Sequence, residues 1–315
     1  MSKPRRSRGG TVRRRTLIAT ALALIAPALA LASASPALAA PKGIFAKYSD
    51  CPTEVPGVAI CTFGQTTSGE FAIGKTKVPI NKTITLQGGG IPTGGVNSNE
   101  YFLYPAKDGN SLSKTELNVP GGLLGLVNCT EIKGEGFFEK IERAACKAIF
   151  ENKTTGVTAT TELVATATNP AILDLAALVE GSGTAITLPV RVHLKNPLLG
   201  EGCYVGSAAH PIQLHLTTGT TAPPPPNKPI TGKLGTPKTE IEKGYESTVI
   251  KENTLVDNAF SAPVSEGCGG LFSFLIGPII NSKIGLPSAA GHNTAILSGT
   301  LNTAETEAVL ASEKF

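Results

Sequence analysis

The chain has 315 residues, of which 28 are lysine or arginine and 24 are aspartate or glutamate, so its formal net charge is +4. Seven of the basic residues and none of the acidic ones lie within residues 1–15. The remainder carries 21 basic and 24 acidic residues, a net charge of −3. It therefore lacks the positive excess with which nucleic-acid-binding proteins hold phosphates, and no nucleic acid is expected as a partner.

Residues 1–39 are predicted to be a cleaved secretory signal peptide. The basic segment is followed by an apolar run, residues 17–32, and then by Ala37-Leu38-Ala39, the kind of small-residue sequence that signal peptidases cleave. We therefore expect the mature chain, residues 40–315, to be secreted into the extracellular space, either free or associated with the cell envelope.

Two features of this leader bear on the route of export. Arg14 and Arg15 loosely resemble a twin-arginine signal, so both this route and the general secretory route stay open. Pro27 and Pro36 interrupt the apolar segment, which argues against the alternative of a retained membrane anchor.

The mature chain is predicted to be mainly β. Gly (35 residues) and Pro (23 residues) are abundant in the sequence and threonine is frequent, a composition that suits strands joined by many turns. We expect residues 40–315 to form a single antiparallel β-sandwich or barrel-like domain, stapled by disulfides and carrying one or two short helices.

Several short strands are predicted before residue 170. They cover residues 69–73, 78–80, 83–86 and 101–104, and a Thr-rich segment, 157–167. The best helix candidate is 137–150, where Phe137, Ile141 and Ile149 recur at helical spacing. A second short helix is predicted at 170–179.

Two later strands have a clearer pattern. Ile186–Lys195 alternates, with apolar residues on one face and Arg191, His193 and Lys195 on the other, and Ile212–Leu216 repeats the alternation. Further short strands are predicted at 248–250, 258–262 and 294–301. Between these groups, residues 221–229 contain four consecutive prolines and are predicted to form a stiff surface loop within the domain.

The run from residue 271 to 280 contains seven large apolar side chains and is too short to span a bilayer. We expect it to plug one end of the sheet structure as part of the core. Two alternatives stay open, a pocket or partner surface and a surface for lipid. The residues of this possible ligand or partner surface are Leu271, Phe272, Phe274, Leu275 and Ile276.

All the cysteines follow the leader: Cys51, Cys61, Cys129, Cys146, Cys203 and Cys268. An even number in an exported chain indicates disulfides, with about fifteen possible pairings for six cysteines. We predict Cys203–Cys268, because both stand in the local sequence Glu-Gly-Cys and because full pairing requires one bridge across the Pro-rich segment. Cys51–Cys61 and Cys129–Cys146 are the remaining local pairings.

Catalytic and metal-binding patterns are weak in this sequence, so neither a cofactor nor a metal is expected. The cysteine spacings match no zinc motif, although His193 and His215 could meet across two paired strands. A secreted hydrolase stays an alternative, because His210 and His292 each follow a serine closely and Asp257 could supply the acid. Tyr101 and Tyr104 are near enough in sequence to form a small sugar-stacking platform.

Two parts of the sequence carry a resemblance. The first is NPLLGEGCYVGSAAHPIQLHLTTGTTAPPPPNKPITG (196–232), and the second is LVDNAFSAPVSEGCGGL (255–271) with its continuation GLPSAAGHNTAILSGTL (285–301). Both resemble exported proteins of high-GC Gram-positive bacteria that carry no known activity. The resemblance is best over residues 185–302 and implies a bacterial, single-domain exported protein. It implies no mechanism.

Taken together, these features predict a non-catalytic binding or structural module that is secreted or held in the cell envelope. Its partner would be an envelope component or a hydrophobic ligand. The alternatives are a secreted hydrolase, and an envelope protein that exposes residues 271–280 to lipid or to an apolar ligand.

Overall fold

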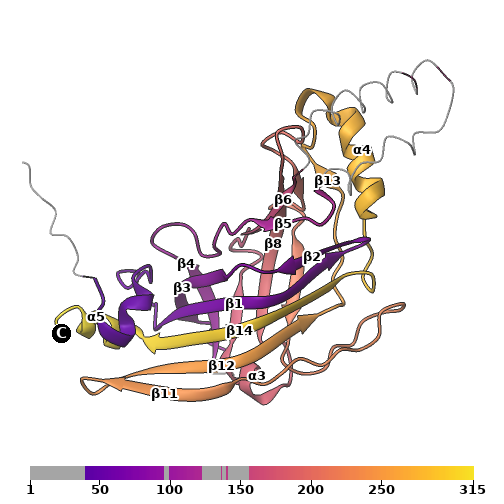
Figure 1. The fold of residues 1–315 in the computed structure, drawn as a ribbon. Coiled ribbons are helices and arrows are strands. Elements are labelled where there is room, and N and C mark those ends of the chain that lie inside the picture. Colours follow the sequence, from indigo (N-terminus) through magenta and orange to yellow (C-terminus); the bar gives the residue numbers. More distant parts are fainter. Residues whose placement is uncertain (1–39, 96–98, 123–135, 137–139, 141–155) are drawn as a thin grey trace, which may run out of the picture. The chain divides into compact units, whose positions relative to one another are not determined.

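A computed structural model of the chain describes residues 40–95, 99–122, 136, 140 and 156–315. These residues are mainly β, as predicted, and all their strand pairings are antiparallel (Figure 1). The strands are β1 (Ile60–Ile73), β2 (Thr76–Ile80), β3 (Ile84–Pro92), β4 (Glu100–Pro105), β5 (Leu117–Asn118), β6 (Thr158–Leu163), β7 (Ile172–Asp174), β8 (Ile186–Lys195), β9 (Tyr204–Val205), β10 (Ile212–Leu216), β11 (Thr236–Glu242), β12 (Tyr245–Asp257), β13 (Ser265–Glu266) and β14 (Thr294–Glu305). The helices are η1 (Gly43–Tyr48), α3 (Leu175–Glu180), η3 (Gly270–Phe272), α4 (Ser273–Ile284) and α5 (Thr306–Ser312).

The strands form one open antiparallel sheet. Its hydrogen-bonded path runs β11-β12-β14-β1-β3-β4-β7-β8-β6-β5, with β2 beside β1, β9 and β10 beside β8, and β13 beside β9. An isolated bridge between Thr217 and Val256 connects the chain after β10 to β12, with N–H···O distances of 3.0 and 2.8 Å. Within the described residues the sheet thus curls so that the end of β10 meets β12, but a single bridge joins them and the sheet is not closed.

β8 lies at the junction of the sheet. One of its edges pairs with β6 and β7, and the other pairs with β9 and β10. Its alternating side chains, Ile186, Leu188, Val190, Val192 and Leu194, are all buried in the main core. The predicted bounds of β8 and β10 are confirmed, because strict alternation marks a strand with one face in the core.

Three predicted elements differ from the structure or lie outside its described part. Residues 258–262 form no strand; only Ala262 makes an isolated bridge, to Ser288. Residues 170–179 contain β7 before α3 begins, because the carboxylate of Asp174 accepts a hydrogen bond from the N–H of Ala177 (3.0 Å) and caps the helix there. The predicted helix 137–150, together with Cys129 and Cys146, falls outside the described residues.

The Pro-rich segment forms a loop whose ends meet. The N–H of Thr221 donates to the carbonyl of Ile230 (2.9 Å). At the far end, the side-chain amide of Asn227 donates to the carbonyls of Asn258 (2.9 Å) and Asn293 (2.8 Å). The two bonds of Asn227 fasten the loop to two segments that follow it in sequence.

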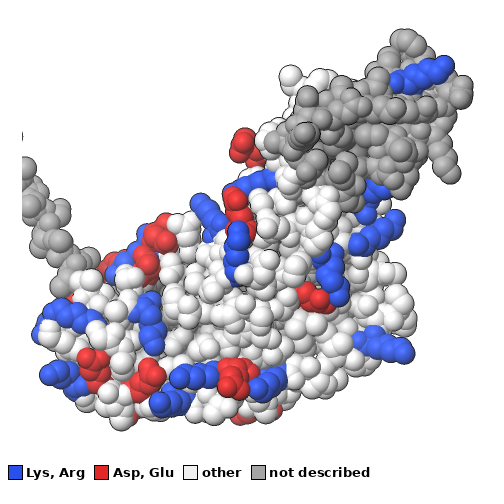
Figure 2. All heavy atoms as spheres, in the orientation of Figure 1, with Lys and Arg blue, Asp and Glu red and all other residues white. Residues whose placement is uncertain are grey.

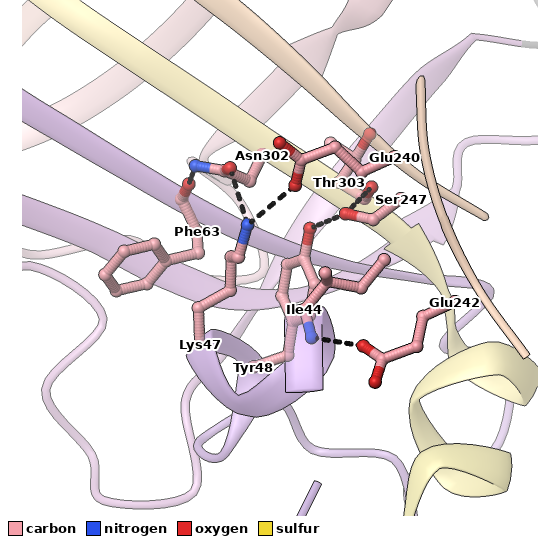
Figure 3. Close-up of polar contacts among 9 residues, drawn as sticks. All are labelled: Ile44, Lys47, Tyr48, Phe63, Glu240, Glu242, Ser247, Asn302 and Thr303. Carbon is pink, nitrogen blue, oxygen red and sulfur yellow. Dashed lines mark hydrogen bonds and ion pairs between the residues drawn. The ribbon is translucent and has the colours of Figure 1, made fainter. Parts of the chain in front are cut away.

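A second, smaller core, separate from the main core, is formed where η1 and α5 pack beside β1 and the end of β14. Polar contacts fasten η1 to β11, β12 and β14 (Figure 3). The Ile44 N–H donates to Glu242 (2.7 Å), and Lys47 donates to Asn302 (3.1 Å). The hydroxyl of the buried Tyr48 lies 2.8 Å from that of Ser247. The segment next to the predicted cleavage point is therefore built into the fold.

Two predicted disulfides are present, Cys51–Cys61 and Cys203–Cys268. The first closes a short loop against η1, with a sequence separation of 10 residues, and the second joins the start of β9 to the segment before η3, with a separation of 65 residues. All four cysteines are buried. The second bridge crosses the Pro-rich segment in sequence, which agrees with the prediction from cysteine parity.

Replacing each bridge by a pair of serines tests their contributions. Because a disulfide restricts the unfolded chain more when its loop is longer, we expect Cys203→Ser/Cys268→Ser to lose about 4 kcal/mol of unfolding free energy and Cys51→Ser/Cys61→Ser about 3 kcal/mol. Urea unfolding of the oxidised proteins measures both values. The loop-length explanation is contradicted if the shorter bridge contributes as much as the longer one.

The pH dependence of stability tests the burial of Tyr48. Burial raises the pKa of its phenol well above the ordinary value of 10.0, because the phenolate is disfavoured away from water. A group whose pKa is raised on folding stabilises the protein below its unfolded pKa and loses that contribution as the pH rises above it. Urea unfolding at pH 8 and pH 11 should therefore show a smaller alkaline loss of stability in Tyr48→Phe than in the wild-type protein. Equal losses would contradict burial of this hydroxyl.

Candidate functional site

The candidate site is η3 with the first turn of α4, the segment that contains the predicted partner surface. α4 (orange-yellow in Figure 1) lies beside β13, at the end of the sheet where β5, β6 and β8 also end. Gly285 ends the helix in a left-handed conformation (φ 82°), and its N–H donates to the carbonyl of Asn281.

The inner face of α4 is part of the main core. Ile276, Ile280 and Ile284 are spaced four residues apart, so they lie on one side of the helix, and all three are buried. Ile279 packs partly against the same core. The prediction that the run plugs one end of the sheet is therefore correct for its second half.

The start of the run has the opposite environment. The exposed fractions of Leu271, Phe272 and Phe274 are 94%, 59% and 77%, whereas Leu275 is half-buried and Ile276 is buried. The expectation that these first residues belong to the core is wrong. Three large apolar side chains next to one another in solvent are unusual for a soluble domain and indicate a surface for interaction.

The position of this exposed tip is fixed by the residues that directly precede it in sequence. The disulfide Cys203–Cys268 ends two residues before η3, and the N–H of Gly269 donates to the carbonyl of Leu199 (2.6 Å). Gly269 has φ 92°, and a β-carbon there would lie 2.5 Å from that of Ile276. Only glycine fits this close approach, which turns the chain so that Leu271 and Phe272 lie outside while Ile276 enters the core.

Charged residues are absent from the sequence around the tip. Residues 267–282 contain no lysine, arginine, aspartate or glutamate. Along the side of the molecule formed by β11 and β12, basic and acidic side chains are mixed (Figure 2). The tip is therefore an apolar surface whose own segment carries no charge.

The two strand histidines do not meet. β8 and β10 do pair antiparallel, but His215 lies opposite Thr187, whereas His193 lies opposite Thr160 on β6 and Tyr204 on β9. His193 is buried, stacks on the Tyr204 ring (centroids 4.3 Å apart) and has Nδ1 3.5 Å from Glu162. Within the described residues, no group of three or more His, Cys, Asp or Glu side chains is placed to hold a metal.

The serines and histidines weighed for hydrolysis also lie in unsuitable positions. The hydroxyl of Ser207 accepts a hydrogen bond from the backbone N–H of His210 (3.2 Å), which is a turn contact. Ser288, near the exposed His292, is buried. Burial raises the pKa of Asp257, whose carboxylate accepts backbone N–H groups and is bonded to no imidazole in the described part of the chain.

The tyrosine pair weighed as a sugar platform does not share a face. Tyr101 and Tyr104 are three residues apart on β4, and side chains at odd spacing point to opposite sides of a strand. Phe102 and Tyr104 share a face instead, and the exposed fraction of each is 39%. This pair was not predicted from the sequence, in which only tyrosines were candidates for a sugar platform.

The chain matches no protein-family model, no curated protein and no solved structure. Among the described helices, none is both long enough and apolar enough to cross a membrane.

The two faces of α4 should respond differently to substitution. Ile280→Ala leaves a cavity in the core and should lower the unfolding free energy by about 2–5 kcal/mol. The triple variant Leu271→Ser/Phe272→Ser/Phe274→Ser should change it by less than about 0.5 kcal/mol, since its side chains lie in solvent. Urea unfolding compares them. A large loss in the triple variant would show that the tip is packed in the folded protein.

Proposed function

We propose that the chain is an exported, non-catalytic module that attaches reversibly to a lipid surface of the cell envelope through Leu271, Phe272 and Phe274. The observation that carries this proposal is the exposure of these three side chains on a segment whose position is fixed by a disulfide and by the buried face of α4. Because the disulfide and the buried face of α4 already hold this segment in place, binding should cost little conformational entropy.

The size of the exposed surface supports a reversible attachment. Burying one leucine or phenylalanine side chain contributes about 1.5–3 kcal/mol, so transfer of the three into hydrocarbon contributes about 5 kcal/mol before the loss of motion is subtracted. This is comparable to the binding that a single short lipid anchor provides, which is marginal and reversible. The proposed module would exchange between the envelope and the surrounding fluid.

The absence of charge favours lipid over a protein partner. Protein interfaces usually surround their apolar centre with a polar or charged rim, whereas residues 267–282 contain no charged side chain. A segment of this kind can enter hydrocarbon without moving an ion out of water. Because no basic residue lies on it, the attraction should come from apolar contact and should not depend on anionic lipid.

Export is supported by two independent features. The sequence begins with the pattern of a secretory leader, and two buried disulfides join segments of the described domain. Disulfides of this kind persist in oxidising compartments outside the cytosol.

Vesicle flotation tests the proposal. The oxidised protein, collected from the medium after export and with its first residue established by mass spectrometry, is mixed with neutral phosphatidylcholine vesicles. We expect it to float with them to the same extent at about 0.1 M and about 1 M NaCl, since screening affects only charge interactions. Leu271→Ser/Phe272→Ser/Phe274→Ser should stay at the bottom of the gradient.

Ile241→Ser provides the matched control, because Ile241 is an apolar side chain with an exposed fraction of 65% on β11, far from α4 in sequence. It should float like the wild-type protein. Flotation that requires anionic lipid and disappears in high salt would contradict apolar attachment. A wild-type protein that never floats with neutral vesicles would exclude it.

A further inference from the structure

An apolar groove lies beside β4, on a different part of the sheet from α4. It has a volume of about 520 Å³ and is formed by the ends of β3 and β4, the loop after β4, and the turn that follows β6. Its wall includes Ile91, Phe102, Tyr104, Leu163 and Ala165. Small-molecule sites in proteins commonly occupy about 300–1,000 Å³ and are mostly apolar, so the size and walls of this groove fit a ligand.

The groove exists because β4 loses a neighbour partway along its length. β4 pairs with β7 only up to the Phe102–Ile172 pair, followed by one further hydrogen bond from the N–H of Leu103 to the carbonyl of Ala171 (2.9 Å). Beyond this point the neighbouring chain leaves as a tight turn, in which Thr166 and Asn169 exchange backbone hydrogen bonds of 3.0 and 3.1 Å. The space between β4 and this turn is therefore open.

Two aromatic rings dominate one wall. Phe102 and Tyr104 stand two residues apart on β4 and hence on the same face, and each is partly exposed. Such rings provide flat surfaces on which another ring can stack. Across the opening lie Leu163 and the small residues Ala165 and Ala167, which leave room for a bound molecule.

The polar groups of the wall are hydroxyls, and none of its side chains is charged. They belong to Tyr104, Ser111 and Thr166. Ser111 Oγ accepts the backbone N–H of Ala106 (2.9 Å), so its own proton is available for another acceptor. The hydroxyl of Tyr104 has no hydrogen-bond partner among the residues that the structure describes. A charged ligand would find no counter-ion on this wall, whereas an uncharged one with an acceptor oxygen would find donors.

We propose that this groove binds an uncharged, mostly apolar small molecule that stacks a flat ring on Phe102 and Tyr104 and presents a carbonyl or ether oxygen to the hydroxyls. This proposal is independent of the one for α4, because it uses other residues on another part of the sheet. It would make the exported module a carrier of, or a receptor for, a hydrophobic compound.

Nile red is a suitable probe, because it is uncharged, planar and apolar, carries a carbonyl oxygen, and fluoresces strongly only away from water. Titrating the exported protein into the dye should give a saturable, blue-shifted signal with one site per chain. Tyr104→Phe should weaken binding about threefold to tenfold, the usual effect of losing one neutral hydrogen bond.

The double variant Ala165→Asp/Ala167→Asp places two short, charged side chains at exposed wall positions and should weaken binding at least tenfold. Ala208→Asp/Ala209→Asp makes the same change at exposed positions of another turn and should bind like the wild-type protein. Equal thermal unfolding temperatures would show that all variants are folded. The triple serine variant of the α4 tip should also keep full binding.

Three results would overturn the proposal. These are the absence of a saturable signal, an affinity unchanged by the two aspartates, and a signal lost in the α4 triple variant but kept in Ala165→Asp/Ala167→Asp. The last result would place the dye on the α4 tip, so failure of this inference is distinguishable from failure of the proposed lipid attachment.

Discussion

The pairing of β8 on both edges is the constraint on which the rest of the structure depends. The strand pairs with β6 and β7 on one edge and with β9 and β10 on the other, and its five alternating apolar side chains are buried in the main core. Cys203 directly precedes β9, so the pairing of β9 with β8 fixes its position. Its disulfide partner, Cys268, lies just before η3 and α4. The location of the candidate site therefore follows from the location of this strand.

α4 adds a second constraint, because a helix directs residues four positions apart to one side. Ile276, Ile280 and Ile284 therefore enter the core together, whereas Leu271 and Phe274 are not at this spacing and Phe272 precedes the helix, in η3. The backbone turn at Gly269 and the disulfide hold the start of the apolar run in place, so its exposure is a property of the folded state. An apolar tip on a firmly seated helix suits contact with lipid, whereas the groove beside β4 arises from a different cause, the departure of a neighbouring strand.

Residue patterns predicted the parts of the fold in which one face is buried and the other is not. β8 and β10 have the predicted bounds for this reason, and the two disulfides whose cysteines are described were also predicted. β11 was missed because it is an edge strand with polar residues on both faces. α4 was missed because Gly277 and Pro278 disfavour a helix, yet tertiary packing of the isoleucines holds it. The sequence identified the apolar tip but not its exposure, since burial depends on the long-range disulfide and the close approach at Gly269.

The most direct measurement of the central claim is the depth of the tip in a bilayer. The chain contains no tryptophan, so Phe272→Trp introduces a single tryptophan at the tip, which can be excited selectively over the tyrosines, and Ile241→Trp provides the same probe on β11. With neutral vesicles that contain brominated acyl chains, the account predicts a blue shift and quenching of the tryptophan emission in the Phe272→Trp variant and no change in the Ile241→Trp variant. Emission from the Phe272→Trp variant that stays typical of water and unquenched would contradict insertion of the tip into lipid.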